Sequence, residues 1–228
     1  MRNCRQIINA QNADMNFSFD TIDNFEEHIE TSVPGYIQLN EYIISILGYF
    51  LNKSHLIDIG CSTGYLLNKI QYHYPDNTYT GLDISENLFN QGKINNNIKL
   101  VNFDLTKNDI DSADVYVSVF TLQFLPINIR YKILRNIYTK LPDGGCLVIA
   151  EKIFLDNGKM QDIFSFSHYD YKEKTFSASD IFKKQKDLRR IMKPLTEYEN
   201  ICMLNNAGFK NISSFWQNLL FKAWLCIK

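Results

Sequence analysis

A short turn of small residues is the first feature of this chain that points to chemistry. The turn follows the apolar run 56–59, precedes a helical pattern from residue 65, and reads DIGCSTG from Asp58 to Gly64. Small residues at such a turn let backbone amides approach a ligand closely. In parallel α/β sheets ligands bind where strands end and turn into helices, so we expect a cofactor here. The expected contact residues are Asp58, Gly60, Cys61, Ser62 and Gly64.

Three classes of ligand can be compared for this turn. A nucleotide-binding P-loop needs a lysine after its last glycine, and no lysine follows Gly64. A dinucleotide fingerprint needs three glycines, and the turn has only Gly60 and Gly64. The third pattern, D-x-G-x-G-x-G, binds S-adenosylmethionine, and Ser62 here replaces its middle glycine. The Asp58 carboxylate would repel a pyrophosphate but attract the ammonium group of S-adenosylmethionine, so the third class is favoured.

Two further acids follow the next two apolar runs. Asp83 can accept hydrogen bonds from both ribose hydroxyls, and Ile84, directly after it, is also expected to contact the cofactor. Asp104 can accept from the adenine amino group, and Leu105 can offer a backbone N–H to the ring. Each acid alone is equally well explained as a turn residue. At the carboxyl ends of three successive strands, together with the small-residue turn, the three acids predict an S-adenosylmethionine site.

Apolar runs and amphipathic helical patterns alternate through the middle of the chain. We expect strands at 55–60, 78–84, 98–104, 113–122 and 146–152. The fourth run is apolar almost throughout, which is typical of a strand buried on both faces. Two strand-like runs close the chain, with a hairpin turn expected at Gln217-Asn218. The sequence predicts an α/β protein with a Rossmann-like seven-stranded sheet, parallel except for a C-terminal antiparallel hairpin.

Two helical segments accompany this alternation. Residues 1–53 are expected to form an N-terminal helical cap, and one of its helices presents a single apolar face made of Tyr42, Ile46, Tyr49 and Phe50. Residues 156–193 are polar, aromatic and mostly helical, and this insertion after the fifth strand would cover the mouth of the pocket. No linker or repeat divides the chain, so we expect one domain over residues 1–228.

The composition is that of a globular protein and argues against several other classes. A net charge of −1 argues against a dedicated nucleic-acid surface. The longest apolar run is too short to span a bilayer, and the first residues lack the apolar core of a signal peptide. None of the five cysteines has C-x-x-C spacing, so no metal site is expected. We therefore expect a cytoplasmic protein without membrane association.

The turn, the strand-end acids and the closing hairpin resemble the class I S-adenosylmethionine-dependent methyltransferases. From about Val33 to the C-terminus, the segments SVPGY, VFTLQFL, GGCLVIAEK and HYDYK and the hairpin are similar to one branch, the carboxy-S-adenosylmethionine synthases of the tRNA wobble-uridine pathway. That branch attaches a carboxyl fragment of prephenate to the methyl group of S-adenosylmethionine. The resemblance implies S-adenosylmethionine as cofactor and a homodimer with the insertion near the partner. It also implies that Tyr36 lies over the sulfonium, because a tyrosine suits a cation.

The chain departs from this branch at two positions. The resemblance implies an arginine that grips the new carboxylate where this chain has Gln185. It also implies an asparagine where this chain has Val119, which we still expect to contact the cofactor. A neutral amide cannot replace the bidentate, charge-assisted pair of arginine and carboxylate. We therefore expect methyl transfer to a small-molecule acceptor, with carboxy-S-adenosylmethionine synthesis as the alternative. A non-catalytic binding subunit and a tRNA methyltransferase using the basic run 183–190 are less favoured.

The acceptor side offers few residues for catalysis. His168 in the insertion can accept a proton from an O–H or N–H nucleophile because its ordinary pKa lies near neutral pH, although a structural hydrogen bond explains it equally well. Glu151, at the end of the fifth strand, is a second candidate base. His168 and Tyr36 are the expected catalytic residues, and the segment 168–171 is expected to share a cavity with Tyr36. Nothing in the sequence identifies the acceptor.

Overall fold

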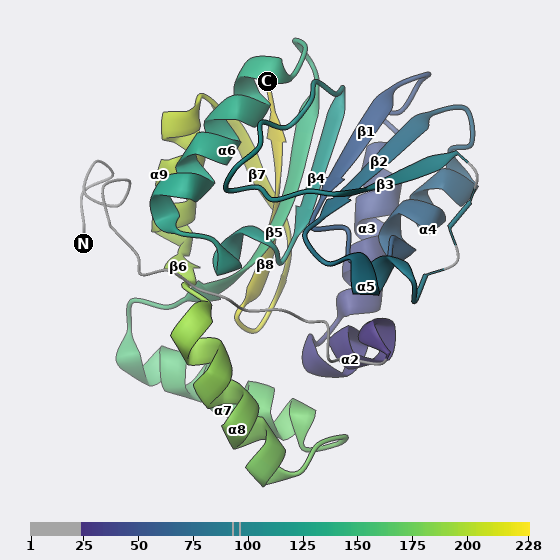
Figure 1. Ribbon diagram of the computed structural model, residues 1–228. Coiled ribbons are helices and arrows are strands. Elements are labelled where there is room, and N and C mark those ends of the chain that lie inside the picture. The colour runs from purple at the N-terminus through teal and green to yellow at the C-terminus, as the bar shows by residue number, and fades with distance from the viewer. Residues whose placement is uncertain (1–23, 93, 96) are drawn as a thin grey trace.

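The centre of the molecule is an eight-stranded sheet in the computed structural model, which describes residues 24–92, 94–95 and 97–228. The strands follow the order β3-β2-β1-β4-β5-β8-β7, and β6 pairs with β5 off this path (Figure 1). The strands are β1 (His55–Ile59), β2 (Thr78–Asp83), β3 (Ile98–Asn102), β4 (Val115–Val119), β5 (Cys146–Phe154), β6 (Leu195–Thr196), β7 (Asn211–Asn218) and β8 (Phe221–Ile227).

The pairing of the strands agrees with the predicted fold. β1 to β5 pair in parallel, β8 runs antiparallel to β5, and β7 runs antiparallel to β8. This confirms the α/β class and the seven-stranded path with its C-terminal hairpin. The two-residue β6, which pairs with the end of β5, is an eighth strand that the sequence pattern did not indicate.

The predicted position of the hairpin turn is wrong by two residues. Gln217 and Asn218 still pair with Lys222 and Phe221 in the ladder, so they belong to β7. The turn is formed instead by Leu219 and Leu220, and Leu219 takes a left-handed φ of 47°. A polar pair marked the turn in the sequence, but pairing in the ladder decided where it lies.

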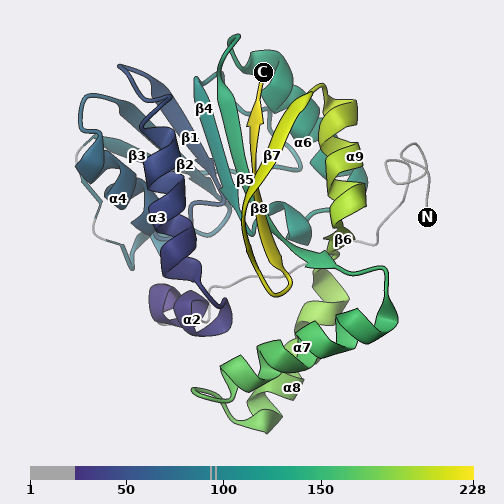
Figure 2. The ribbon, with the colours of Figure 1, turned by 180° about the vertical axis from the view of Figure 1, so that it is seen from behind.

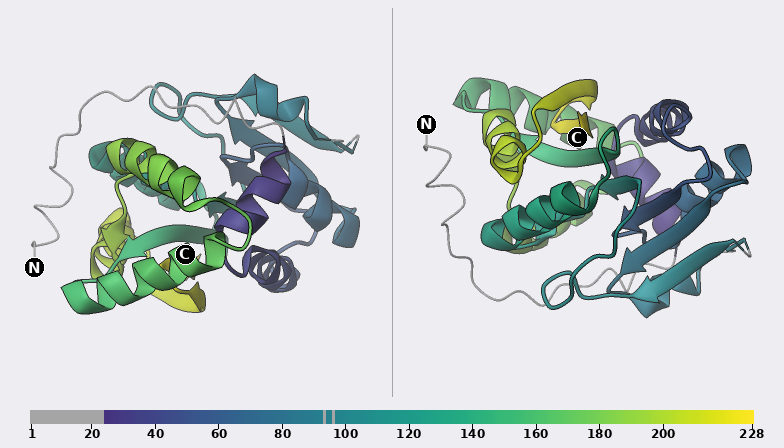
Figure 3. Two further views of the ribbon diagram at one scale, coloured as in Figure 1. Left: turned by 90° about the horizontal axis from the view of Figure 1, so that it is seen from below. Right: turned by 90° about the horizontal axis from the view of Figure 1, so that it is seen from above.

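Helices cover both faces of the sheet. α3 and α4 pack on one face, and α6 and α9 pack on the other (Figures 1 and 2). α2, α7 and α8 lie together beyond the end of the sheet at which β5 leads into α7, and Figure 3 shows them in front of the strand ends when viewed from below. The helices are α2 (Phe25–Ser32), α3 (Tyr36–Leu47), α4 (Tyr65–His73), α5 (Glu86–Phe89), η1 (Leu122–Phe124), α6 (Ile127–Lys140), α7 (Gly158–Lys172), α8 (Ala178–Ile191) and α9 (Glu197–Ala207).

Alternation along the central strands divides the core into two layers. In β4, Val115 and Val117 join the cluster with α3 and α4, whereas Tyr116 joins the cluster with α6 and α9. All three side chains are fully buried. Since burying one large apolar side chain contributes about 1.5–3 kcal/mol, both layers hold the strands firmly and fix the edge at which they end.

α3 uses a different face from the one predicted. Its buried apolar residues are Tyr36, Leu39, Ile43 and Leu47, spaced three or four residues apart. Tyr42 and Tyr49, which were expected on the buried face, are exposed. The prediction followed the helical spacing of aromatic residues. The aliphatic Ile43, next to Tyr42 in the sequence, packs against the sheet instead.

The insertion is helical, as its composition predicts. α7 starts after Asn157, whose side chain accepts from the Met160 amide, and α8 starts after Ser177, which caps the Asp180 amide. The Lys193 amide donates to the Gln123 carbonyl and ties the end of the insertion to η1. Within the expected cap 1–53, residues 1–23 lie outside the described range, and the division into one domain with a cap and a lid stays a prediction.

Candidate functional site

A cavity of about 1060 Å³ opens at the carboxyl ends of the parallel strands. Its wall combines the turn after β1, the ends of β2, β4 and β5, the helices α2 and α3, and the insertion. The predicted site residues that line it are Tyr36, Asp58, Gly60, Cys61, Ser62, Asp83, Ile84, Asp104, Leu105, Val119 and His168. Gly64 is outside the wall and acts at the N-terminus of α4, where its φ is 78°. These residues come from positions 36 to 168 of the chain, a span of 133 residues. The topology of the sheet brings them together in one cavity.

The turn after β1 has an unusual backbone. Gly60 and Ser62 both have positive φ, 77° and 53°. A side chain at Gly60 would place its Cβ 2.1 Å from Thr121 Oγ1, so this position requires glycine. Ser62 replaces a glycine of the pattern and keeps the left-handed conformation, which costs a non-glycine residue on the order of 1 kcal/mol. The backbone of the binding turn is thus retained although one glycine is absent.

Asp83 fixes this turn to the end of β2. One carboxylate oxygen accepts from the Ser62 amide at 2.9 Å and the other from the Ser85 amide at 3.0 Å. Each oxygen has a further lone pair, so the carboxylate can also accept from ligand hydroxyls. Its position between the turn and the cavity suits the ribose role predicted for it, and that role stays a prediction.

Asp58 places a carboxyl group inside the cavity wall. It is 3% exposed, and burial together with the charge of Asp83 raises its pKa to about 7. Such a carboxyl gains from a cation, which would favour its ionised form. The amino group and sulfonium of S-adenosylmethionine are cations, so these carboxyl groups fit the cofactor better than they fit a phosphate.

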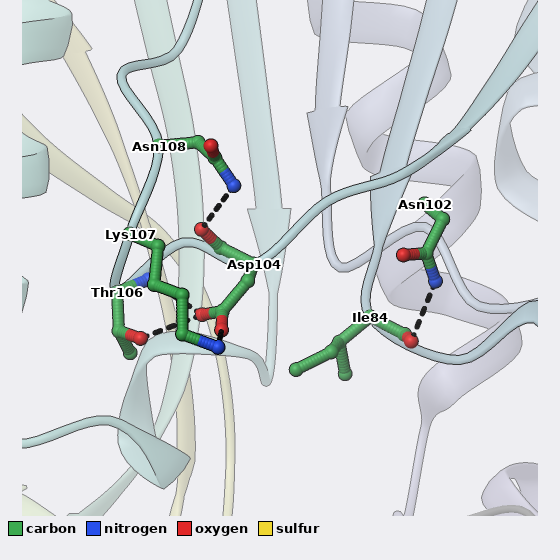
Figure 4. A network of polar contacts seen from close by, with 6 residues as sticks. All are labelled: Ile84, Asn102, Asp104, Thr106, Lys107 and Asn108. Atoms are coloured by element: carbon green, nitrogen blue, oxygen red, sulfur yellow. Dashed lines mark hydrogen bonds and ion pairs between the residues drawn. The ribbon is translucent and has the colours of Figure 1, made fainter.

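Asp104 is engaged by its own loop (Figure 4). Its carboxylate accepts from the amide and hydroxyl of Thr106 at 2.9 and 2.6 Å and pairs with Lys107 at 2.8 Å. The hydrogen bonds from Lys107 and Thr106 lower the pKa of Asp104 to about 2. These contacts use much of the acceptor capacity that the predicted adenine contact needs, and that contact stays a prediction.

The loop after β2 presents an apolar surface next to Asp104. Ile84 is 63% exposed and lines the cavity, and Asn102 donates to its carbonyl at 2.8 Å (Figure 4). An aliphatic side chain held in this way can lie against the face of an aromatic ring, which removes apolar surface of both from water. The arrangement suits the base of a nucleoside.

The two predicted catalytic residues share the cavity. Tyr36 is buried at the start of α3, and burial raises the pKa of its phenol so that it stays neutral. His168 donates from Nε2 to the Ser32 carbonyl at 2.8 Å, and burial with the nearby Lys152 charge lowers its pKa to about 4. Tyr171 instead bonds the Glu30 carbonyl and does not line the cavity. The segment 168–171 therefore faces the cavity only in part.

Glu151, the second candidate base, does not line the cavity. It is buried behind the wall, where it accepts from the Leu122 amide at 3.1 Å, and burial raises its pKa to about 8. This contact positions η1 and the preceding segment. Phe120 in that segment has φ 56°, so the chain bends sharply where Val119 and Thr121 meet the cavity.

The structure adds residues that sequence reasoning missed. Lys152, the last predicted residue of the fifth strand, and Lys172 at the end of α7 line the cavity together. Glu26 of α2 accepts a hydrogen bond from the Thr63 hydroxyl and so joins the cap to the cofactor turn. The only available signal was that Lys152 ends a strand that runs toward the site. The residues of α2 and α7 reach the cavity through tertiary packing, which no local pattern encodes.

The described part of the chain contains neither a cluster of metal-binding side chains nor a helix that could span a membrane. No group of three or more His, Cys, Asp and Glu side chains within it is placed to hold a metal ion. No helix within it combines the length and the hydropathy that a membrane span requires.

Comparison with known proteins agrees with this geometry. Residues 57–147 match a methyltransferase domain family. The chain is 33% identical over 212 residues to the carboxy-S-adenosyl-L-methionine synthase of Staphylococcus epidermidis, covering 89% of this chain and 92% of that protein. It is 31% identical over 231 residues to the enzyme of the same name from Shewanella sediminis, covering 95% and 93%.

Solved structures show the same fold at low sequence identity. Human N-acetylserotonin methyltransferase in complex with SAM superposes with a TM-score of 0.56 at 16% identity, covering 84% of this chain and 55% of that one. The S-adenosylmethionine-dependent methyltransferase SibL gives a TM-score of 0.58 at 11% identity, with coverage of 85% and 55%. The chain spans about half the length of these two proteins. It therefore belongs to the class I S-adenosylmethionine-dependent methyltransferase superfamily, within the sequence family of the carboxy-S-adenosyl-L-methionine synthases, and S-adenosylmethionine is its cofactor.

Proposed function

We propose that this enzyme transfers the methyl group of S-adenosylmethionine to a small-molecule acceptor bound in the cavity. The observation that carries this proposal is the neutral Gln185, half-buried in the cavity wall at the position where the resemblance to the synthases implies an arginine. A carboxylate on the transferred group would lack the bidentate, charge-assisted pair that an arginine at this position forms. An unmodified methyl group needs no such partner.

The residues that would hold the cofactor follow from the site. Asp58 would face its cationic groups, Asp83 its ribose, and Ile84 its base, with Tyr36 as a neutral aromatic neighbour. The cofactor supplies a methyl group already activated by the sulfonium. The chain then has to bring the acceptor into line and exclude water, and α2, α7 and α8 around the cavity mouth support this covering role.

His168 is the residue proposed to take the proton of the acceptor. Because its Nε2 donates to a carbonyl oxygen, Nδ1 carries the lone pair of the neutral ring. A pKa of about 4 makes the ring neutral at pH 7 and a weaker base than an ordinary histidine. This supports a positioning and proton-accepting role for acceptors whose proton is already acidic, with orientation supplying much of the rate.

Carboxy-S-adenosylmethionine synthesis from prephenate is the second candidate. The relatives that match almost the whole chain at about one-third identity carry this name, which favours the second candidate. Incubating the purified protein with S-adenosylmethionine and prephenate separates the two functions by mass spectrometry. Efficient formation of the carboxylated nucleoside would favour the second candidate, and its absence together with methyl transfer to an added acceptor would support the first.

We also propose a homodimer located in the cytoplasm. One face of α7 carries Met160, Ile163 and Phe166 at a spacing of three residues, and each is at least half exposed. Apolar residues gathered on one helix face are typical of an interaction surface. This supports a dimer in which the insertion lies near the partner. A tRNA acceptor is less favoured, because the net charge of the chain is −1.

A further inference from the structure

The cavity has two ends of opposite charge. Its acids lie on the cofactor side, at the turn, the strand ends and α2. The end under the insertion is lined by basic side chains from four elements, namely His28 of α2, Lys152 of β5, His168 and Lys172 of α7, and Lys184 of α8. No carboxylate from the described residues lies within ion-pair distance of Lys152 or Lys172.

Lys152 and Lys172 are unusually buried for lysines. Their exposed fractions are 7% and 8%. Lys152 Nζ lies 5.5 Å from the centre of the Phe221 ring, and Lys172 Nζ lies 5.6 Å from that of Phe176. Aromatic faces compensate an ammonium only partly, and a buried charge without an anion is costly.

The basic groups line one cavity, where their charges affect one another. Burial, then the charges of Lys172 and Arg189, lower the pKa of Lys152 to about 8. Burial and then Lys184 lower the pKa of Lys172. Burial, then the charges of Lys184 and Lys172, lower the pKa of His28 to about 4. An anion placed among these groups would relieve the repulsion and favour the charged form of each lysine.

We propose that Lys152 and Lys172 form a subsite for an oxyanion, a carboxylate or a phosphate, carried by the second substrate. Lysine ammonium groups bind such anions as compact point charges, without the planar fork that an arginine needs. The subsite would hold an anionic group of the acceptor beside His168, at the end of the cavity under the insertion. This inference rests on the proposed function and deepens it, and the anion contact itself can be measured without the cofactor.

The test measures anion binding by the full-length protein alone. Thermal unfolding at pH 7 is followed during titration with sodium phosphate or sodium succinate, with sodium chloride at equal ionic strength as the reference. We expect one of the two oxyanions to raise the melting temperature above the chloride reference, and the larger shift identifies the class of anion. Lys152→Met and Lys172→Met should each weaken the apparent affinity about tenfold or more, because each removes a charged partner.

A matched control separates the subsite from general surface charge. Lys159 is exposed on α7 and lies outside the cavity, so Lys159→Met should keep the wild-type response. In chloride, Lys152→Met and Lys172→Met should melt at or above the wild-type temperature, because each removes an uncompensated buried charge. If one variant does not fold, the other still provides the comparison.

Two results would overturn the subsite. One is the absence of any oxyanion shift in the wild type. The other is an unchanged shift in the folded lysine variants. Calorimetry with S-adenosylmethionine on the same proteins tests the proposed function separately from the subsite. If the wild type does not bind S-adenosylmethionine, the proposed function is contradicted. The response to oxyanions still decides whether the subsite exists.

Discussion

The Asp83 carboxylate accepts a hydrogen bond from the Ser62 backbone amide at 2.9 Å, which joins the end of β2 to the turn after β1. The same carboxylate accepts from the Ser85 amide. Asp83 therefore shapes the binding turn and also lines the cavity. Ser62 holds its left-handed conformation at a position where the sequence pattern expects glycine, and this contact helps to hold it there.

Replacing Asp83 should weaken cofactor binding strongly. Asp83→Ala removes two backbone contacts of the turn and the proposed ribose acceptor, so we expect a loss of about 2 kcal/mol or more in binding free energy. Isothermal calorimetry with S-adenosylmethionine measures this. Asp76→Ala, at an exposed position before β2, serves as the control and should bind normally. An unchanged affinity for Asp83→Ala would show that Asp83 is only a turn residue.

Cofactor binding should release a proton near pH 6. The pKa of Asp58 is raised to about 7 in the free protein, through burial and the charge of Asp83, and a bound cation would lower it again. Calorimetry at pH 6 in two buffers of different ionisation enthalpy should show the release of about one proton on binding. The number of protons released should fall toward zero by about pH 8.5. In Asp58→Asn the release should vanish. Equal heats in both buffers at pH 6 would contradict the assignment of Asp58.

Asp58 should also give the free protein a characteristic pH dependence of stability. Its pKa rises from an ordinary 3.8 to about 7 on folding, so between these values the folded chain keeps a proton that the unfolded chain has lost. The Asp58 contribution to the free energy of unfolding is full below about pH 4 and falls as the pH rises to about 7. Urea unfolding of the wild type and of Asp58→Asn should differ in this slope. Parallel curves over this range would be inconsistent with the raised pKa.

The sequence predicted the strands and the acids at their ends because both depend on local pattern. Asp58, Asp83 and Asp104 each follow an apolar run, and parallel topology then brings them to one edge. It did not predict the lysine end of the cavity, because Lys172 comes near Lys152 only after the insertion packs across the end of the sheet at which β5 leads into α7. The buried face of α3 was missed for a similar reason: the fit of Leu39 and Ile43 against the sheet, rather than residue size, selects that face.

The glycine requirement at position 60 can be separated from its backbone conformation. Gly144 has a φ of 80° and open space where a methyl group would lie, whereas a methyl group at Gly60 would meet Thr121. Gly144→Ala should cost about 1 kcal/mol of stability through conformation alone. Gly60→Ala should cost at least about 2 kcal/mol and also weaken cofactor binding. Chemical unfolding of both variants checks this, and equal losses would mean that the Thr121 contact adjusts freely.

The exposed face of α7 should hold the proposed dimer together. Phe166 is 64% exposed, and Phe166→Asp would place a charge in that interface. Size-exclusion chromatography with light scattering should give a dimer for the wild type and a monomer for this variant. Tyr72→Asp, at an exposed site on α4, should remain dimeric. A monomeric wild type would remove this part of the proposal.

The most direct measurement of the central claim is the mass of the nucleoside that copurifies with the protein. The account predicts S-adenosylmethionine or its demethylated product, because Gln185 offers no positive charge to a carboxylate on the transferred group. Denaturing the purified protein and analysing the released ligand by mass spectrometry gives the answer in one step. Recovery of the carboxylated form of S-adenosylmethionine as the main bound species would contradict the account.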